Sequence, residues 1–443
     1  MAKGFTIAGG GSLTGRLRVP GDKSISHRSM MLGALADGVT RVTGFLEGAD
    51  AISTMNVFRS LGVRIEGPDQ GRVTVHGVGI DGLKGASVPL DCGNAGTAMR
   101  LLMGLLAGQR FESVLIGDES LSRRPMRRVA DPLALMGARI ETAAGGTPPV
   151  RILPAGGLRG IDYRLPVASA QVKSAILLAG LYAEGETAVT EPAPTRDHTE
   201  RMLTGFGVRV ERTGARASLR GGQRLRAATL DVPADISSAA FFLVGASIAA
   251  GSDLLLEHVG MNPTRTGIID ILRLMGAQIE VLSPREVGGE PVADLRVRAS
   301  ALKGIEVPPE LVPLAIDEFP VLFVAAACAE GRTVVTGAHE LRVKESDRIA
   351  TMAVGLAAIG FPVQPTEDGM VIDGRGGEAL PFAGGTVDSH GDHRIAMAFA
   401  MAALRSRTPV HVRDTANVAT SFPGFTGLAA AAGSRIADVD LPG

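Results

Sequence analysis

Polar clusters that open apolar stretches are the residues of this chain best suited to chemistry. The segment Gly21-Asp22-Lys23-Ser24-Ile25-Ser26-His27-Arg28 places two cations and two hydroxyls before an apolar stretch at residues 30–36. A helix start there would add unpaired backbone N–H groups and a positive dipole end, which favour anions. The layout recurs five times, with polar residues at 94–97, 169–171, 235–238, 317–318 and 392–394 before apolar stretches at 101–107, 176–183, 241–250, 321–329 and 395–404. Ordinary N-capping explains any single copy, but six copies, with Lys23, Arg28 and Arg394 near their starts, predict an anion site.

Four further charged segments lie between the polar clusters. They are residues 122–128, 195–201, 262–265 and 342–348, and the first is dense in Arg, which binds phosphate and carboxylate bidentately. A solvated helix face explains any one of these charge runs. Lys344, Glu345 and Arg348 nevertheless combine an acid with two cations, and Asp317 before a buried helix offers a base. These types suit acid–base chemistry on an anionic substrate.

Two repeated patterns must position these residues. The six apolar stretches are apolar on nearly all faces, which predicts six helices buried inside packed units. Between them lies an amphipathic helix that ends on Gly and is followed by an alternating strand. Copies occur at residues 60–66, 135–141, 205–211 and 274–280, with looser copies at 358–363 and 432–436. The period of about 70 residues exceeds that of solenoid repeats, so we expect six small α/β units.

The two halves of the chain also resemble each other. Val19-Pro20-Gly21-Asp22-Lys23-Ser24 is similar to Val232-Pro233-Ala234-Asp235-Ile236-Ser237, and each is a strand broken by Pro before a helix start. Because 443 residues exceed what one core usually serves, we expect two lobes of three units each. One lobe spans residues 21–235, and the other combines residues 1–20 with 236–443.

Composition excludes several classes of protein. The net charge of −1, the aromatic content of 4% and the lack of Trp argue against a nucleic-acid-binding protein. Two cysteines give neither a disulfide framework nor zinc spacing, and we read Cys92 as a small buried residue. Asp392 with the histidines 390 and 393 lacks convincing ligand spacing, so we expect no metal. The apolar stretches are too short to span a membrane, and without a signal-peptide core we expect a cytoplasmic protein.

Taken together, these segments resemble one family, 5-enolpyruvylshikimate-3-phosphate (EPSP) synthase, along essentially the whole chain. The resemblance rests on residues 21–28, Gly93-Asn94-Ala95-Gly96-Thr97, Arg124-Pro125, residues 342–348 and Asp392-His393-Arg394, in this order. It implies an α/β fold of two lobes, each with three βαβαββ units around buried parallel helices. It also implies an active site in the cleft between lobes that close on binding.

The resemblance implies that the enolpyruvyl group of phosphoenolpyruvate is transferred to the 5-hydroxyl of shikimate 3-phosphate, with release of phosphate. No cofactor is implied, and we expect a monomer. Asp317 would act as base and Glu345 as acid, while Lys23 and Lys344 would stabilise charge. The residues implied for shikimate 3-phosphate are Lys23, Ser24, Arg28, Ser169, Ala170, Gln171, Arg196, Asp317 and Lys344. Those implied for phosphoenolpyruvate are Lys23, Gly96, Arg124, Gln171, Arg348 and Arg394.

Some residues depart from the better-known members. Glu340, Thr420 and Ala170 stand where Asn, Lys and Ser are common. Residues 169–173, 196–200 and 262–265 instead resemble the glyphosate-tolerant subgroup, so we expect weaker inhibition by glyphosate than in the sensitive class. Three alternatives stay open: the sister UDP-N-acetylglucosamine enolpyruvyl transferase, a non-catalytic anion-binding repeat protein and, least favoured, a nucleic-acid-binding protein. The sister enzyme's reactive-Cys loop has no counterpart at Leu121-Ser122-Arg123-Arg124.

Overall fold

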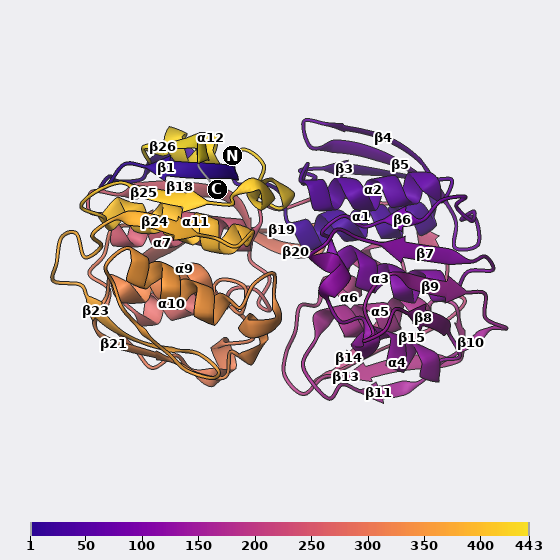
Figure 1. Ribbon diagram of the computed structural model, residues 1–443. Coiled ribbons are helices and arrows are strands. Elements are labelled where there is room, and N and C mark those ends of the chain that lie inside the picture. Colours follow the sequence, from indigo (N-terminus) through magenta and orange to yellow (C-terminus); the bar gives the residue numbers. More distant parts are fainter. Residues whose placement is uncertain (1, 442–443) are drawn as a thin grey trace. The chain divides into compact units, whose positions relative to one another are not determined.

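Two compact units make up the chain in the computed structural model, which describes residues 2–441 (Figure 1). Unit 2 comprises Gly21–Val232 together with Val287–Glu290. Unit 1 comprises the N-terminal residues up to Pro20, then Pro233–Glu286 and the chain from Pro291 onward. Each unit has its own hydrophobic core.

Three buried helices form the centre of unit 2: α1 (Lys23–Leu35), α3 (Gly96–Ala107) and α5 (Ala170–Gly180). The carboxylate of Asp22 and the hydroxyl of Ser169 accept backbone N–H bonds at the starts of α1 and α5, so polar residues begin these helices. A Cβ on Gly104 would lie 2.0 Å from the carbonyl oxygen of Ala175. Glycine therefore allows α3 and α5 to pack closely. The outer helices are α2 (Ala49–Ser60), α4 (Arg127–Leu135) and α6 (His198–Gly205).

Unit 2 contains three main sheets, and in each of them parallel pairing is followed by two antiparallel pairs; the first sheet has five strands and the other two have four. The first runs from β16 (Leu225–Arg226) and β17 (Thr229–Asp231) to β3 (Ala36–Thr43), β5 (Arg72–Val78) and β4 (Arg64–Asp69). The second runs through β6 (Leu90–Asp91), β7 (Ser113–Ile116), β9 (Val150–Leu153) and β8 (Arg139–Thr142). The third runs through β11 (Asp162–Arg164), β13 (Glu186–Thr190), β15 (Arg216–Arg220) and β14 (Val210–Thr213), and β10 (Leu158–Arg159) pairs separately with β12 (Ala183–Glu184).

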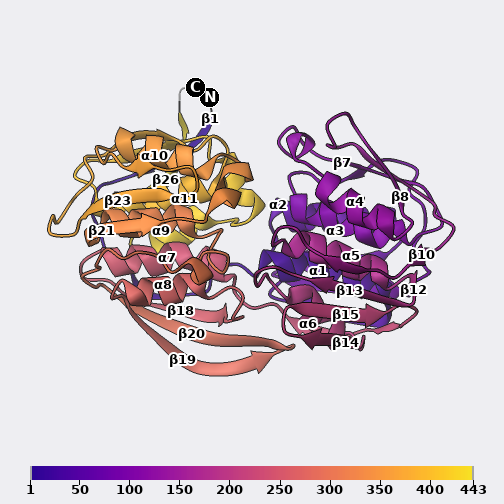
Figure 2. The same ribbon diagram turned by 90° about the horizontal axis from the view of Figure 1, so that it is seen from below.

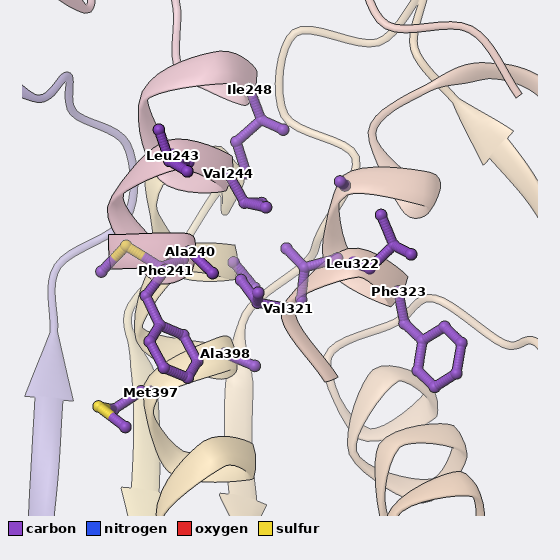
Figure 3. Close-up of a cluster of buried hydrophobic side chains, with 14 of the residues drawn as sticks. Ala240, Phe241, Leu243, Val244, Ile248, Val321, Leu322, Phe323, Met397 and Ala398 are labelled. Carbon is purple, nitrogen blue, oxygen red and sulfur yellow. The ribbon is translucent and has the colours of Figure 1, made fainter. Parts of the chain in front are cut away.

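Unit 1 repeats this plan around the buried helices α7 (Ile236–Ile248), α9 (Phe319–Ala327) and α11 (His393–Ala402). Figure 3 shows side chains from all three helices, among them Phe241, Val321 and Met397, in one apolar cluster. The outer helices are α8 (Gly267–Leu274), α10 (Arg348–Ala358) and α12 (Phe425–Ala431). Burial on every face explains why these central helices are almost entirely apolar.

Two of the three sheets of unit 1 follow the same order of pairs, and the third has three strands joined by two antiparallel pairs. One contains β2 (Thr14–Leu17), β18 (Asp253–Gly260), β20 (Glu290–Arg298) and β19 (Gln278–Val287), and α7 packs against its strand β18 (Figure 2). Another contains β21 (Glu330–Val335), β23 (Met370–Arg375) and β22 (Gln364–Pro365). The last sheet has the strand order β24 (Gly385–Asp388), β25 (Val410–Arg413), β1 (Ala2–Ile7) and β26 (Ile436–Leu441). The chain's first strand therefore pairs with β25 and β26 and completes this sheet.

The predicted fold class is confirmed: the structure has an α/β fold with six repeats around buried helices. The Gly after each outer helix has a positive φ, as the predicted helix ends require; these are Gly62, Gly137, Gly207, Gly276, Gly360 and Gly433. Some helix ends were predicted too late, since α5 ends at Gly180 and Ala183 lies in β12. Similarly, the apolar stretch at residues 30–36 extends past the end of α1 at Leu35, and Ala36 begins β3. The apolar pattern does not distinguish the end of a buried helix from a buried strand.

Candidate active site

The starts of the three central helices of unit 2 are joined by side-chain hydrogen bonds. Gln171, in the first turn of α5, donates from Nε2 to Thr97 Oγ1 in α3 at 3.0 Å. Arg28 of α1 donates from Nη2 to Ser174 Oγ of α5, also at 3.0 Å. Three helix N-termini therefore lie together, and their backbone N–H groups and dipoles favour an anion.

Lys23 and Arg28 provide cations at the start of α1. Lys23 Nζ lies 2.5 Å from Asp50 Oδ2, a buried carboxylate in the first turn of α2. Arg28 is buried and donates from Nε to Thr199 Oγ1 at 2.7 Å and from Nη1 to the carbonyl oxygen of Ser24 at 3.0 Å. Burial lowers the pKa of Arg28 to about 10, opposed by nearby carboxylates, so its guanidinium remains a cation at neutral pH.

His27 lies on the same helix turn but is neutral. Burial, reinforced by the charges of Lys23 and Arg28, lowers the pKa of His27 to about 3. Its Nδ1 lies 2.7 Å from Thr54 Oγ1. His27 therefore contributes packing and a hydrogen bond rather than charge.

Gly96 and Arg124 meet at the start of α3. Arg124 donates from Nη2 to Asn94 Oδ1 at 3.0 Å and to Ser120 Oγ at 3.2 Å. A Cβ built on Gly96 would lie 3.0 Å from Arg124 Nη1. The bare glycine thus allows the guanidinium to lie against the helix start.

Gln171 is held by a residue that sequence reasoning did not select. Arg100 of α3 is buried and donates from Nη1 to Gln171 Oε1 at 2.5 Å and from Nη2 to the carbonyl oxygen of Pro125 at 3.2 Å. Arg100 therefore links the α5 start to the segment that carries Arg124. It stands within an apolar helix body, and a cation there is the signal that could have identified it.

Unit 1 contains a second cluster of predicted residues, around a buried arginine. Arg348, 1% exposed, donates from Nε to Asp392 Oδ2 at 2.8 Å and from Nη2 to Glu345 Oε2 at 2.6 Å. Its Nη1 lies 3.4 Å from Asp317 Oδ1. Although burial disfavours the charge, Asp392, Glu345 and Asp317 together raise the pKa of Arg348 above its ordinary value.

Asp317 is the point at which three segments of this cluster meet. Its Oδ1 lies 3.3 Å from Lys344 Nζ, beyond a 3₁₀ helix, His339–Val343. Its carbonyl oxygen accepts from Arg394 Nη1 at 3.0 Å. Arg394 follows Asp392, whose carboxylate caps α11. The carboxylates of Asp317 and Glu345 and three cations therefore lie at the starts of α9, α10 and α11.

The structure thus divides the predicted residues between the two units. Unit 2 contains Lys23, Ser24, Arg28, Gly96, Arg124, Ser169, Ala170, Gln171 and Arg196, and unit 1 contains Asp317, Lys344, Glu345, Arg348 and Arg394. Ala170 is the first residue of α5, and Arg196 lies close enough to Arg28 to lower its pKa. Of the departures, Glu340 lies in the 3₁₀ helix, and Thr420 donates to the carbonyl oxygen of Asn417 at 2.6 Å. The sequence also did not identify Asp50, because a helix start explains an Asp at that position.

The structure also bears on three other features considered from the sequence: Cys92, a metal site and a membrane-spanning helix. Cys92 is fully buried, and burial raises the pKa of its thiol. Within residues 2–441, no group of three His, Cys, Asp or Glu side chains is arranged to hold a metal ion. Over the same residues, every helix is too short or too polar to cross a membrane.

Comparison with known proteins identifies the family. The model of the family described as EPSP synthase (3-phosphoshikimate 1-carboxyvinyltransferase) matches residues 7–428. The chain belongs to the EPSP synthase family. The 3-phosphoshikimate 1-carboxyvinyltransferase of Alkalilimnicola ehrlichii is 67% identical over 439 residues, covering 99% of this chain and 98% of that protein. The enzyme of Methylococcus capsulatus is 64% identical over 98% of both chains.

Solved EPSP synthase structures agree with this assignment. The structure of EPSP synthase from Acinetobacter baumannii superposes with a TM-score of 0.90 at 58% identity, over 99% of this chain and 100% of that one. The chain therefore catalyses the reaction of this family, in which phosphoenolpyruvate and shikimate 3-phosphate yield 5-enolpyruvylshikimate 3-phosphate and phosphate. This is a step of the shikimate pathway of aromatic biosynthesis. The acceptor is therefore shikimate 3-phosphate, as predicted from the resemblance.

Proposed function

We propose that the cluster of unit 2 binds the two anionic substrates. Ser24, Arg28, Ser169, Gln171 and Arg196 hold shikimate 3-phosphate, and Ala170 lies beside them at the α5 start. The support is the convergence of three helix N-termini with buried cations, of which Arg28 is 4% exposed. Two anions repel each other unless cations offset their charges, and in a site from which water is excluded those cations act strongly.

Phosphoenolpyruvate, in this proposal, lies against Lys23, Gly96, Arg124 and Gln171. Arg124 and Lys23 already lie in fixed positions through Asn94 and Asp50. Arg348 and Arg394 provide further cations from unit 1, which requires that the two lobes, residues 21–235 and residues 1–20 with 236–443, close on a cleft that holds both substrates.

The acid and base of the transfer come from unit 1. Asp317 accepts the proton of the 5-hydroxyl while the hydroxyl oxygen bonds to C2 of phosphoenolpyruvate. Glu345 delivers a proton to the methylene carbon of phosphoenolpyruvate. The resulting tetrahedral intermediate then loses that proton and phosphate, which restores the double bond. Lys23 and Lys344 stabilise the charge that develops. The observation that carries the assignment is the contact of Asp317 with both Lys344 and Arg348, which fixes the carboxylate among cations.

The experiment compares phosphate release in Asp317→Asn, Glu345→Gln and the control Glu310→Gln, an exposed carboxylate seven residues before Asp317. We expect the first two to lose roughly 10²–10⁴-fold in kcat with native circular dichroism, as for loss of a general acid or base. The control should keep the parental rate. Parental turnover by Asp317→Asn would contradict its assignment as base.

Lobe closure and the monomeric state are tested together by small-angle scattering. We propose that the segments near Pro20 and Pro233 act as hinges. Shikimate 3-phosphate should then reduce the radius of gyration while the scattering mass stays that of one 45.7 kDa chain. An unchanged radius at saturating ligand would contradict closure, and a doubled mass would contradict the monomer.

We also propose that the enzyme belongs to the glyphosate-tolerant subgroup. The segments that resemble this subgroup, residues 169–173, 196–200 and 262–265, form buried ion pairs. Lys173 pairs with Glu200 at 2.8 Å, and Arg265 pairs with Asp235 at 3.1 Å. Leu101, where sensitive relatives usually carry Pro, leaves the α3 backbone free to bond normally. We expect a glyphosate inhibition constant above the KM for phosphoenolpyruvate, and a ratio far below one would refute this proposal.

A further inference from the structure

Four consecutive buried side chains at the start of α6 are each tied to a different segment. They directly follow Arg196, which the proposed function assigns to shikimate 3-phosphate. Residues 197–200 are all 2% exposed or less. Their partners are Arg201 and Arg212 for Asp197, Glu290 for His198, Arg28 and Ser174 for Thr199, and Lys173 for Glu200. The start of α6 is therefore fixed by its side chains, and so is the backbone that carries Arg196.

Glu290 differs from the other partners in its origin. It begins β20, at the tip of the hairpin that joins β19 and β20. The tip, Val287–Glu290, groups with unit 2, whereas both strands otherwise belong to unit 1. Glu290 Oε1 lies 2.8 Å from His198 Nδ1, with side chains 5% and 2% exposed. Because a carboxylate only accepts, Nδ1–H of His198 is the donor.

A second contact holds the same tip. Arg201, one turn along α6, donates from Nη1 to the carbonyl oxygen of Gly289 at 3.1 Å. The hairpin tip thus binds both the first residue of α6 and its first turn. None of the chemistry proposed above uses Glu290 or His198, so this buried pair needs another explanation.

We propose that Glu290 is a positioning residue for shikimate 3-phosphate, acting through His198 to fix the α6 start that carries Arg196 and Thr199. This inference rests on the proposed roles of Arg196 and Arg28. The linkage to Arg28 is direct, because Thr199 accepts from Arg28 Nε at 2.7 Å. A shift of the α6 start would therefore move one phosphate-binding arginine and release a contact of the other.

The sign of the effect separates positioning from simple electrostatics. Glu290 is one of the carboxylates near Arg28, so its negative charge alone disfavours an anionic ligand. If only that field mattered, removing the charge would strengthen substrate binding. Positioning has the opposite consequence, because the loss of the acceptor leaves His198 buried without this bond and lets the α6 start move.

The experiment measures both KM values and kcat for Glu290→Ala and Glu290→Gln in the full chain. We expect Glu290→Ala to raise the KM for shikimate 3-phosphate by about tenfold, which corresponds to about 1.4 kcal/mol. The KM for phosphoenolpyruvate and kcat should stay within about threefold, a change below 1 kcal/mol. Glu290→Gln retains an oxygen that can accept from His198, so its KM should lie between those of the parent and Glu290→Ala.

Two further variants make the result specific. Glu286→Ala removes an exposed carboxylate from the same hairpin and should leave every constant unchanged. In a double-mutant cycle, Glu290→Ala should add little to His198→Ala, because both remove the same bond. If Glu290→Ala does not fold, Glu290→Gln provides the test: a KM at or below the parental value would overturn the proposal.

Arg196→Ala separates this inference from the proposed function. A raised KM for shikimate 3-phosphate in Arg196→Ala, with a parental KM in Glu290→Ala, would overturn positioning alone. A parental KM in Arg196→Ala would instead overturn the assigned role of Arg196. Equal increases in both KM values in Glu290→Ala would also overturn positioning, since they would indicate a general structural defect.

Discussion

Substitution of Gly96 by Ala perturbs the site at one measurable contact. The new methyl would lie 3.0 Å from Arg124 Nη1, 3.8 Å from Arg124 Cδ and 3.5 Å from a methyl of Leu121. Unstrained heavy-atom contacts begin at about 3.5 Å, so the guanidinium must move by about half an ångström. The backbone of Gly96 does not oppose the change, because it starts a regular helix without a positive φ.

The size of the effect follows from the hydrogen bonds of Arg124 that this movement would weaken. A movement of about half an ångström would stretch its 3.0 Å bond to Asn94 and its 3.2 Å bond to Ser120 towards or beyond the usual limit. Hydrogen bonds of a charged group contribute about 1.5–3 kcal/mol. We therefore expect the KM for phosphoenolpyruvate to rise by about tenfold, at the lower end of that range because Arg124 can adjust.

Glyphosate should be affected more than the substrate. The inhibitor is longer than phosphoenolpyruvate, and in the proposed pocket it lies against the α3 start, so the methyl of Gly96→Ala crowds it directly. Overpacking of this kind costs about 1–3 kcal/mol. The ratio of the glyphosate inhibition constant to the KM for phosphoenolpyruvate should therefore rise by roughly tenfold or more.

Steady-state phosphate release with varied phosphoenolpyruvate and glyphosate provides both constants. Gly427→Ala is the matched control, because the added Cβ in α12 meets no atom within 4 Å. In an Arg124→Lys background the guanidinium contact is gone, so Gly96→Ala should barely change the KM but should still weaken inhibition. A parental KM in the single variant would refute the contact with Arg124, and an unchanged ratio would refute crowding of the inhibitor.

Two predictions concern stability. Lys173→Ala removes the cation that pairs with the buried Glu200 and the partly buried Glu191, so we expect a loss of stability of about 3–5 kcal/mol and a fall in Tm of roughly 10 °C by calorimetry. The control Lys84→Ala, at an exposed position, should change stability by less than about 0.5 kcal/mol. The pKa of His27 is about 3 in the folded protein and about 6.5 in the unfolded chain, so the unfolded chain binds the proton first and stability falls as the pH drops below 6.5. Urea unfolding at pH 7 and 5 should show a loss that His27→Gln lacks, of about 2 kcal/mol at pH 5, and equal losses in both proteins would contradict a neutral buried His27.

The fold could be predicted from the sequence because each repeat carries the same local signals. A helix that is apolar on all faces must be buried, and an outer helix must end where Gly can adopt a positive φ. Gly62 and Gly360 both do so, although they lie in different units. The exact helix ends were less predictable, because Leu181–Ala183 continues an apolar pattern after α5 has ended at Gly180. Burial, rather than helix propensity, shapes that pattern.

The residue types of the site could be predicted, but their partners could not. The local pattern indicates that the polar residues at the starts of neighbouring buried helices lie together, because the apolar helix bodies fill the core. It does not indicate that Arg28 contacts Thr199, or that Lys23 contacts Asp50, because those contacts depend on how distant helices pack. In its own segment, each of the partners Thr199 and Asp50 has the pattern of an ordinary capping or surface residue.

Glu290 shows where this limit comes from. As the first residue of a strand after two glycines, it has the local pattern of an exposed hairpin turn. Its burial against His198 requires that a hairpin rooted in unit 1 end in unit 2. An isolated buried carboxylate would be strongly unfavourable, so the pair must form together or not at all. His198 lies between the salt-bridged Asp197 and Glu200, but its partner Glu290 lies 92 residues further along the chain, so no local pattern predicts the pair.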